Sequence, residues 1–230
     1  MSRSGETWFQ LGDRDLGLHL VRTDALRGGE ALSAVTARIA GAAGLEQVLL
    51  PATDDFLRTR IRTEAGVFEF QEWFVARGHR DRVEGVTYEG AETAAPAPGV
   101  LAAMEEADLI AIAPSNPFVS IGPILAVAEI RAAVERRRDH VVAVSPLIGR
   151  RAVKGPAAAM FESLAGGAGA GEVAGFYEGL IGALVIDEAD AVDAGAVEES
   201  GARPLVTRTL MSEPKARQAL VETVLGLVPA

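Results

Sequence analysis

An apolar run that stops at a proline restricts the fold more than any other part of the chain. Residues 109–113 read Leu-Ile-Ala-Ile-Ala and are followed by Pro114. Such a run, apolar at successive positions, is typical of a parallel strand that is buried on both faces. Small polar residues and a glycine come next, and then an apolar stretch with helical spacing. This segment therefore predicts a strand, a polar turn and a helix of a doubly wound α/β domain.

The rest of the C-terminal half continues the alternation of strand and helix. The periodicity predicts helices near residues 98–107, 127–138, 156–165, 171–180 and 213–227. It predicts further strands over 140–144, 183–186 and 205–207. This order favours a mainly parallel, Rossmann-like sheet with helices on both faces. We therefore assign residues 98–230 to the main α/β domain.

The first 97 residues differ in character. Helices are expected over 14–27 and 31–42, with a short buried strand over 47–50, so residues 1–50 are assigned to the first elements of the α/β domain. Alternating apolar and polar residues predict antiparallel strands at 58–63, 67–70 and 83–88. We expect residues 51–97 to form a small insertion lobe built around this hairpin.

Composition narrows the classes of function. The 22 Lys and Arg residues against 32 Asp and Glu give a net charge of −10, which repels polyanions, so nucleic acid is not an expected partner. The absence of cysteine excludes disulfides, thiolate metal sites and cysteine nucleophiles. No apolar run approaches the ~20 residues of a membrane helix. We expect a cytoplasmic protein without a membrane contact, and we leave a homodimer open.

Polar residues that follow two of the predicted strands are the main candidates for ligand binding. Ser115, Asn116, Ser120 and Gly122 come after the strand at 109–113, while Ser145 and Lys154 come after the strand at 140–144. In a doubly wound sheet the carboxyl ends of neighbouring strands share one edge, where ligands bind. A glycine there lets the backbone approach a ligand closely. Both turns are therefore expected to face one cleft.

Two other groups have a functional and a structural interpretation. Asp13, His19 and Arg22 stand near the start of the first helix, where they would order a polar ligand or serve as a cap and an ion pair. Asp54 and Asp55 follow the strand at 47–50 and offer oxygen ligands for Mg²⁺, although acidic pairs are also ordinary loop residues.

At these residues the chain resembles the 2-phospho-L-lactate transferase family, which acts in the biosynthesis of a deazaflavin electron-carrier coenzyme. Ordered matches that run along nearly the whole chain carry the resemblance. They are Trp8–Asp15, His19–Thr23, Leu49–Asp55, Phe70–Phe74, Ala113–Pro117, Ser120–Leu125, Ser145–Gly149 and Thr209–Met211.

The resemblance implies a reaction and a set of roles. A phosphoenolpyruvyl or 2-phospho-L-lactyl group would pass from a GDP-linked donor to the terminal ribityl hydroxyl of a deazaflavin precursor, and GMP would leave. Mg²⁺ and positioned hydrogen-bond donors would align the reactants and neutralise charge. Arg14 would bind the deazaflavin, and Asp13, His19 and Arg22 would support catalysis. The donor site would be formed in the nucleotide-binding domain by Ser115, Asn116, Ser120, Gly122, Ser145 and Lys154.

One departure from the family pattern leaves other functions open. Members begin with a strand and a glycine-rich loop of Gly-Gly-x-Gly type, followed by an acidic segment, and this sequence has neither. We therefore expect the N-terminal strands of the sheet to be missing, which would make the chain a truncated, inactive fragment or the product of a misplaced gene start. A nucleotide-sugar-binding regulatory protein of the same superfamily is the other alternative.

Overall fold

Four parallel strands form the central sheet, in the order β4-β5-β8-β9. The computed structural model describes residues 12–228. The strands are β4 (Ile110–Ile112), β5 (Val141–Val144), β8 (Ala183–Asp187) and β9 (Arg203–Thr207). Their registers pair Ile110 with Val141, Val142 with Ala183, and Ala183 with Arg203. The predicted α/β fold with a mainly parallel sheet is confirmed.

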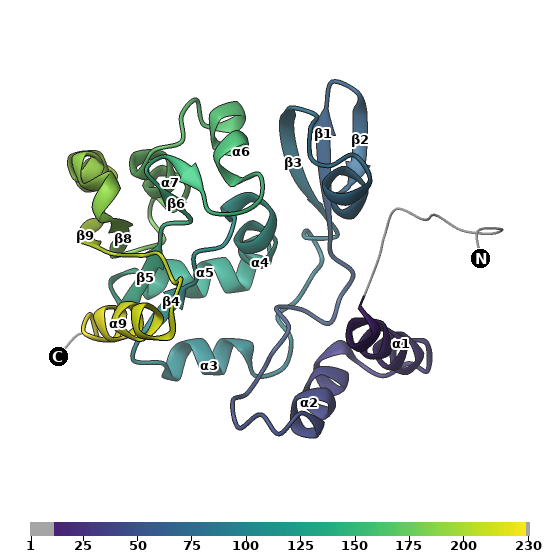
Figure 1. The fold of residues 1–230 in the computed structure, drawn as a ribbon. Helices are drawn as coiled ribbons and strands as arrows, with labels where there is room; N and C mark the ends of the chain where they lie inside the picture. The colour runs from purple at the N-terminus through teal and green to yellow at the C-terminus, as the bar shows by residue number, and fades with distance from the viewer. Residues whose placement is uncertain (1–11, 229–230) are drawn as a thin grey trace.

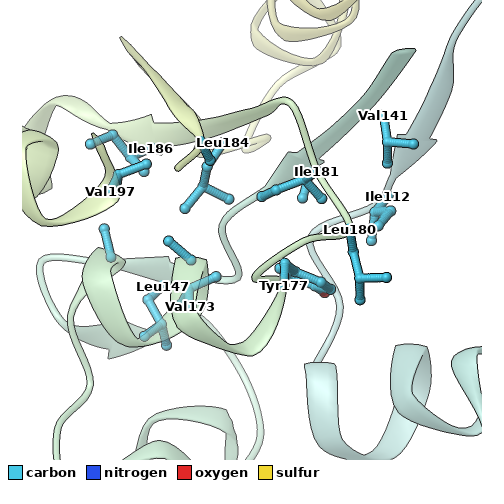
Figure 2. Packing of buried hydrophobic residues seen from close by; sticks show 14 of the residues in the cluster. Ile112, Val141, Leu147, Val173, Tyr177, Leu180, Ile181, Leu184, Ile186 and Val197 are labelled. Carbon is cyan, nitrogen blue, oxygen red and sulfur yellow. The ribbon is translucent and has the colours of Figure 1, made fainter. Parts of the chain in front are cut away.

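Alternate side chains of β5 and β8 enter two separate hydrophobic clusters. Ala143 of β5 and Leu184 of β8 belong to the larger cluster, which Figure 2 shows from close by. Val142 and Val185 point the other way and pack with Leu220 of α9 (Pro214–Leu225). Because successive strand residues face opposite sides, residues 141–144 and 183–186 are all apolar.

Helices cover both faces of the sheet, as the alternating pattern predicted. The five helices predicted for the α/β part are present with bounds that differ by a few residues, whereas the helix at 194–199 was not predicted. The helices of the α/β part are α3 (Val100–Glu106), α4 (Gly122–Leu125), α5 (Ala128–Arg136), α6 (Ala157–Leu164), α7 (Ala170–Phe176) and α8 (Ala194–Glu199), besides α9. Among the described residues no single helix is long and apolar enough to cross a membrane, and only the bent pair Pro117–Leu125 and Ala128–Arg136 would reach that length.

The predicted hairpin is confirmed as part of a three-stranded antiparallel sheet. Its order is β2-β1-β3, with β1 at Arg58–Thr63, β2 at Gly66–Glu69 and β3 at Val83–Glu89. Ile61 and Trp73 are fully buried with Met160 of α6, so this lobe packs against the α/β part. The opposite face of β1 presents arginines that pair with glutamates of β2 and β3.

The N-terminal helices lie apart from the central sheet. Figure 1 shows α1 (Asp13–Arg27) and α2 (Leu32–Ala42) below the antiparallel lobe in this view, away from β8 and β9. The strand predicted over 47–50 is wrong: these residues form no ladder, and Val48 is 81% exposed. A strand needs a hydrogen-bonding neighbour, and the described residues supply none beside this segment.

Gly122 closes the junction between the lobe and the α/β part. Tyr88 of β3 donates a 2.6 Å hydrogen bond to the carbonyl oxygen of Phe118. A Cβ atom on Gly122 would overlap the Tyr88 hydroxyl and lie 2.9 Å from the Pro117 carbonyl oxygen. The sequence predicted that Gly122 would let the backbone approach a ligand. In the structure, the Tyr88 hydroxyl occupies that position instead.

Replacing Gly122 with alanine is expected to destabilise the fold. Because the new methyl group forces both the tyrosine and backbone to move, the free energy of unfolding should fall by about 1–3 kcal/mol in urea denaturation. Gly175→Ala in α7 is the matched control, since nothing lies within 4 Å of its Cβ position. That change should raise stability by up to about 1 kcal/mol through helix propensity. Equal effects of the two changes would contradict the proposed packing.

Candidate functional site

A cleft of about 530 Å³ lies at the carboxyl edge of the parallel sheet. It is formed by the turns after β4 and β5, by the start of α6 and by the segment after β9. Its lining residues are Pro114, Asn116, Ser145, Pro146, Ile148, Val153, Lys154, Ala157, Thr209, Leu210, Met211 and Ser212. Because β4 and β5 are neighbours, the turns that follow them share this cleft, as expected from the sequence.

Two of the predicted polar residues shape their own turns. Asn116 accepts a 3.0 Å hydrogen bond from the Phe118 amide and thereby caps η2 (Pro117–Ile121), and its amide nitrogen lies 3.3 Å from the Met160 sulfur. Ser145 is 3% exposed, and its hydroxyl bonds both the amide and the carbonyl of Leu147. Both side chains are partly engaged inside the protein, so they fix the cleft wall before any ligand arrives.

The cleft is locally positive in an acidic protein. Lys154 is exposed at its edge, and none of the ion pairs between described residues includes it. Helix α6 begins at the cleft with Ala157, and its first turn has neither an acidic residue nor a side-chain cap. The amide groups of a helix start carry partial positive charge. Lysine and helix start together suit an anionic group such as phosphate.

Asp187, the last residue of β8, holds the opposite wall. Its carboxylate accepts hydrogen bonds from the amide of Thr209 at 2.8 Å, from the Thr209 hydroxyl at 3.1 Å and from the Ala189 amide at 3.0 Å. Burial works to raise the pKa of Asp187, but these hydrogen bonds outweigh it and hold the pKa below its ordinary value. The segment from Thr209 to Ser212 is thereby anchored beside the cleft.

Sequence analysis did not assign this C-terminal wall to the site. The signal was present, because Thr209–Met211 is among the matches that carry the family resemblance. Conversely, the structure leaves three predicted residues outside the lining of the cleft. Ser115 is half-buried in the turn, Ser120 is exposed on η2, and Gly122 is covered by Tyr88.

The structure does not bring α1 to this cleft. Asp13 is exposed at the start of α1, Arg14 lies in its first turn with a side chain outside the described structure, and His19 Nδ1 is 2.8 Å from Arg22. Arg22 instead lines a second hollow of about 600 Å³ with Phe56 and Phe70. Arg22 and the turns after β4 and β5 thus line two different hollows, and neither Asp13 nor His19 lines either one.

Asp54 and Asp55 also line the second hollow, but both are engaged in structural hydrogen bonds. The two oxygens of Asp54 accept from the amide and hydroxyl of Ser33 at the start of α2, and Asp55 accepts from the Ala95 amide. Within residues 12–228 no three His, Asp or Glu residues gather in a group that could hold a metal ion. Asp54 and Asp55 thus have structural partners in this arrangement, and Mg²⁺ binding at them stays a prediction.

The family model and the curated relatives indicate one family. The family model described as 2-phospho-L-lactate transferase CofD matches residues 2–221. A 2-phospho-L-lactate transferase from Methanosarcina acetivorans is 36% identical over 222 residues, which cover 96% of this chain and 72% of the relative. A phosphoenolpyruvate transferase from Kitasatospora aureofaciens is 40% identical over 228 residues, with 97% and 71% covered.

A solved structure shares the fold. The crystal structure of a UPF0052-family protein from Bacillus halodurans superposes with a TM-score of 0.69 at 14% sequence identity. The match covers 91% of this chain and 71% of that protein.

Substituting Asp187 with asparagine tests the anchor of the C-terminal wall. The loss of a charged acceptor for Thr209 should lower the free energy of unfolding by about 1–3 kcal/mol at neutral pH. Because the folded pKa is lowered, the advantage of the native protein is complete above the ordinary value of about 4 and is lost as the pH falls through the folded pKa. Urea denaturation of both proteins between neutral and acidic pH measures this difference. A difference that stays constant with pH would contradict the role of the charge.

Proposed function

Because the chain belongs to the 2-phospho-L-lactate transferase CofD family, we propose that it transfers a phosphoenolpyruvyl or 2-phospho-L-lactyl group to a deazaflavin precursor. The donor would be GDP-linked, the acceptor would be the terminal ribityl hydroxyl, and GMP would leave. The observation that carries the proposal is the match of the family model to residues 2–221, together with relatives of both names.

The geometry of the sheet-edge cleft supports a place for the donor. Its volume of about 530 Å³ is within the usual range for small-molecule pockets. Lys154 and the start of α6 would neutralise the phosphates, while the apolar side chains of Pro146 and Leu210 would contact the nucleoside. The attacking hydroxyl forms a bond to the distal phosphorus and loses its proton, and the bridging oxygen leaves with GMP. Such a transfer depends mainly on alignment and charge neutralisation.

The second hollow is our proposed place for the acceptor ring. Phe56 and Phe70 offer aromatic faces for a flat heterocycle, and the Arg22 guanidinium offers N–H donors for the ring's carbonyl oxygens. Arg14, Asp13 and His19 stand on the same helix as Arg22. Helix α1 lies apart from the sheet, so the acceptor site and the donor site are tested separately. Binding of the deazaflavin tests the acceptor site, and the kinetics of transfer test the donor site.

The donor site is tested with the two lysines of the chain. Lys154→Gln should raise the KM for the GDP-linked donor about tenfold to a hundredfold, because a charge-assisted bond to phosphate contributes about 1.5–3 kcal/mol. Lys215→Gln is the matched control, since Lys215 is exposed on α9 and does not line the cleft. Steady-state kinetics with both donor types measures the effect and identifies the preferred donor. Unchanged donor kinetics in Lys154→Gln would refute the site, and a native protein without transfer would refute the proposed function.

The acceptor site is tested by the intrinsic fluorescence of the deazaflavin. Titration should give a Kd that is about tenfold weaker in Arg22→Ala, which corresponds to a loss of about 1.4 kcal/mol. Arg27→Ala removes an exposed arginine from the same helix and should leave the Kd unchanged. A nucleotide-sugar-binding regulator would not bind the deazaflavin at all, and equal Kd values in both variants would remove Arg22 from the site.

A further inference from the structure

The wall of the cleft that carries Lys154 is a hairpin of only two residue pairs. Its strands are β6 (Leu147–Ile148) and β7 (Arg151–Ala152), and Lys154 follows two residues after β7. The turn between them consists of Gly149 and Arg150, with φ angles of 58° and 61°. A left-handed conformation is strained for a residue with a side chain. So short a hairpin therefore needs support from outside itself.

Asp190 supplies that support from a neighbouring element. It belongs to η4 (Glu188–Asp193), the helical turn that follows β8, and it is 3% exposed. One carboxylate oxygen accepts from the Gly149 amide at 2.9 Å, and the other accepts from the Arg150 amide at 3.1 Å. Both oxygens of a buried acid are thus bound to the two residues of the left-handed turn.

Other acids of the same segment make different bonds. Asp193 accepts from the Arg150 guanidinium at 2.7 Å and from the Ala170 amide at the start of α7. Asp187 holds Thr209 on the opposite wall. The segment 187–193 therefore connects both walls of the cleft to the carboxyl end of β8, but only Asp190 binds the backbone of the hairpin turn.

We propose that Asp190 is a positioning residue for the transfer reaction, which holds the Gly149–Arg150 turn and through it places Lys154 against the donor phosphate. This inference rests on the proposed function, since it assigns the donor to the sheet-edge cleft. Asp190 does not line the cleft, so it acts through the hairpin and touches no substrate. Without its carboxylate the turn loses two acceptors, and Lys154 has to be ordered when the donor binds. The expected consequence is a weaker donor complex with a nearly unchanged chemical step.

The rate of cleavage by a lysine-specific protease measures how often the β6–β7 hairpin opens. The chain contains two lysines, so native-state digestion reports on Lys154 and uses Lys215 of α9 as an internal reference. In Asp190→Ala, cleavage after Lys154 should be at least about fivefold faster than in the native protein, because the local opening equilibrium shifts toward the open state. Cleavage after Lys215 should be unchanged. Equal rates after Lys154 would overturn the proposal. The measurement uses no substrate, so it is independent of whether the proposed function is correct.

Kinetics separates positioning from a general loss of stability. Asp190→Ala should raise the KM for the donor about tenfold while kcat stays within about threefold of the native value. Asp190→Asn keeps the shape and one acceptor, so it is expected to fold and to give an intermediate KM. Asp193→Ala is the control, because it removes the bonds to the Arg150 guanidinium and the Ala170 amide but leaves both turn amides held. A similar rise in KM for Asp193→Ala and Asp190→Ala would overturn the proposal.

Discussion

Burial of β5 and β8 on both faces is the constraint on which the other features depend. Ala143 and Leu184 pack into one hydrophobic cluster and Val142 and Val185 into the other. Each fully buried aliphatic side chain contributes about 1.5–3 kcal/mol, so the register of these strands is strongly determined. A shift by one residue would exchange the two faces. The turns at their carboxyl ends are therefore held in fixed relative positions, and the cleft forms between them.

The acidic residues around this cleft do not prevent an anion from binding, because their carboxylates accept hydrogen bonds from the protein itself. Asp187 and Asp190 lie close behind the two walls, and a carboxylate aimed at the ligand would repel a phosphate. Their oxygens are instead bound to the amides of Thr209, Gly149 and Arg150. The free charge at the edge of the cleft is that of Lys154. A chain with a net charge of −10 can thus present a positive surface at one place.

The sequence indicated the elements better than the contacts between them. Apolar runs identified β5 and β8 because burial on both faces leaves an unambiguous pattern, whereas the same reasoning produced a strand at 47–50 that lacks a neighbour. Whether a strand forms depends on what lies beside it, and one sequence does not contain that information. The role of Gly122 was missed for the same reason, since Tyr88 is 34 positions away in the chain. Nothing in the sequence around Asp190 indicates its role, because its hydrogen-bond partners Gly149 and Arg150 belong to a separate hairpin.

Residue type alone also does not distinguish a ligand-binding group from one that builds the site. Asn116 and Ser145 were predicted from their places after two strands, and they do stand at the cleft. Their side chains, however, are bound in part to Phe118, Met160 and Leu147. The positively charged groups at the cleft are the backbone amides at the start of α6 and Lys154. Because those groups act as hydrogen-bond donors and carry positive charge, they favour a phosphate over a neutral sugar or an apolar ligand.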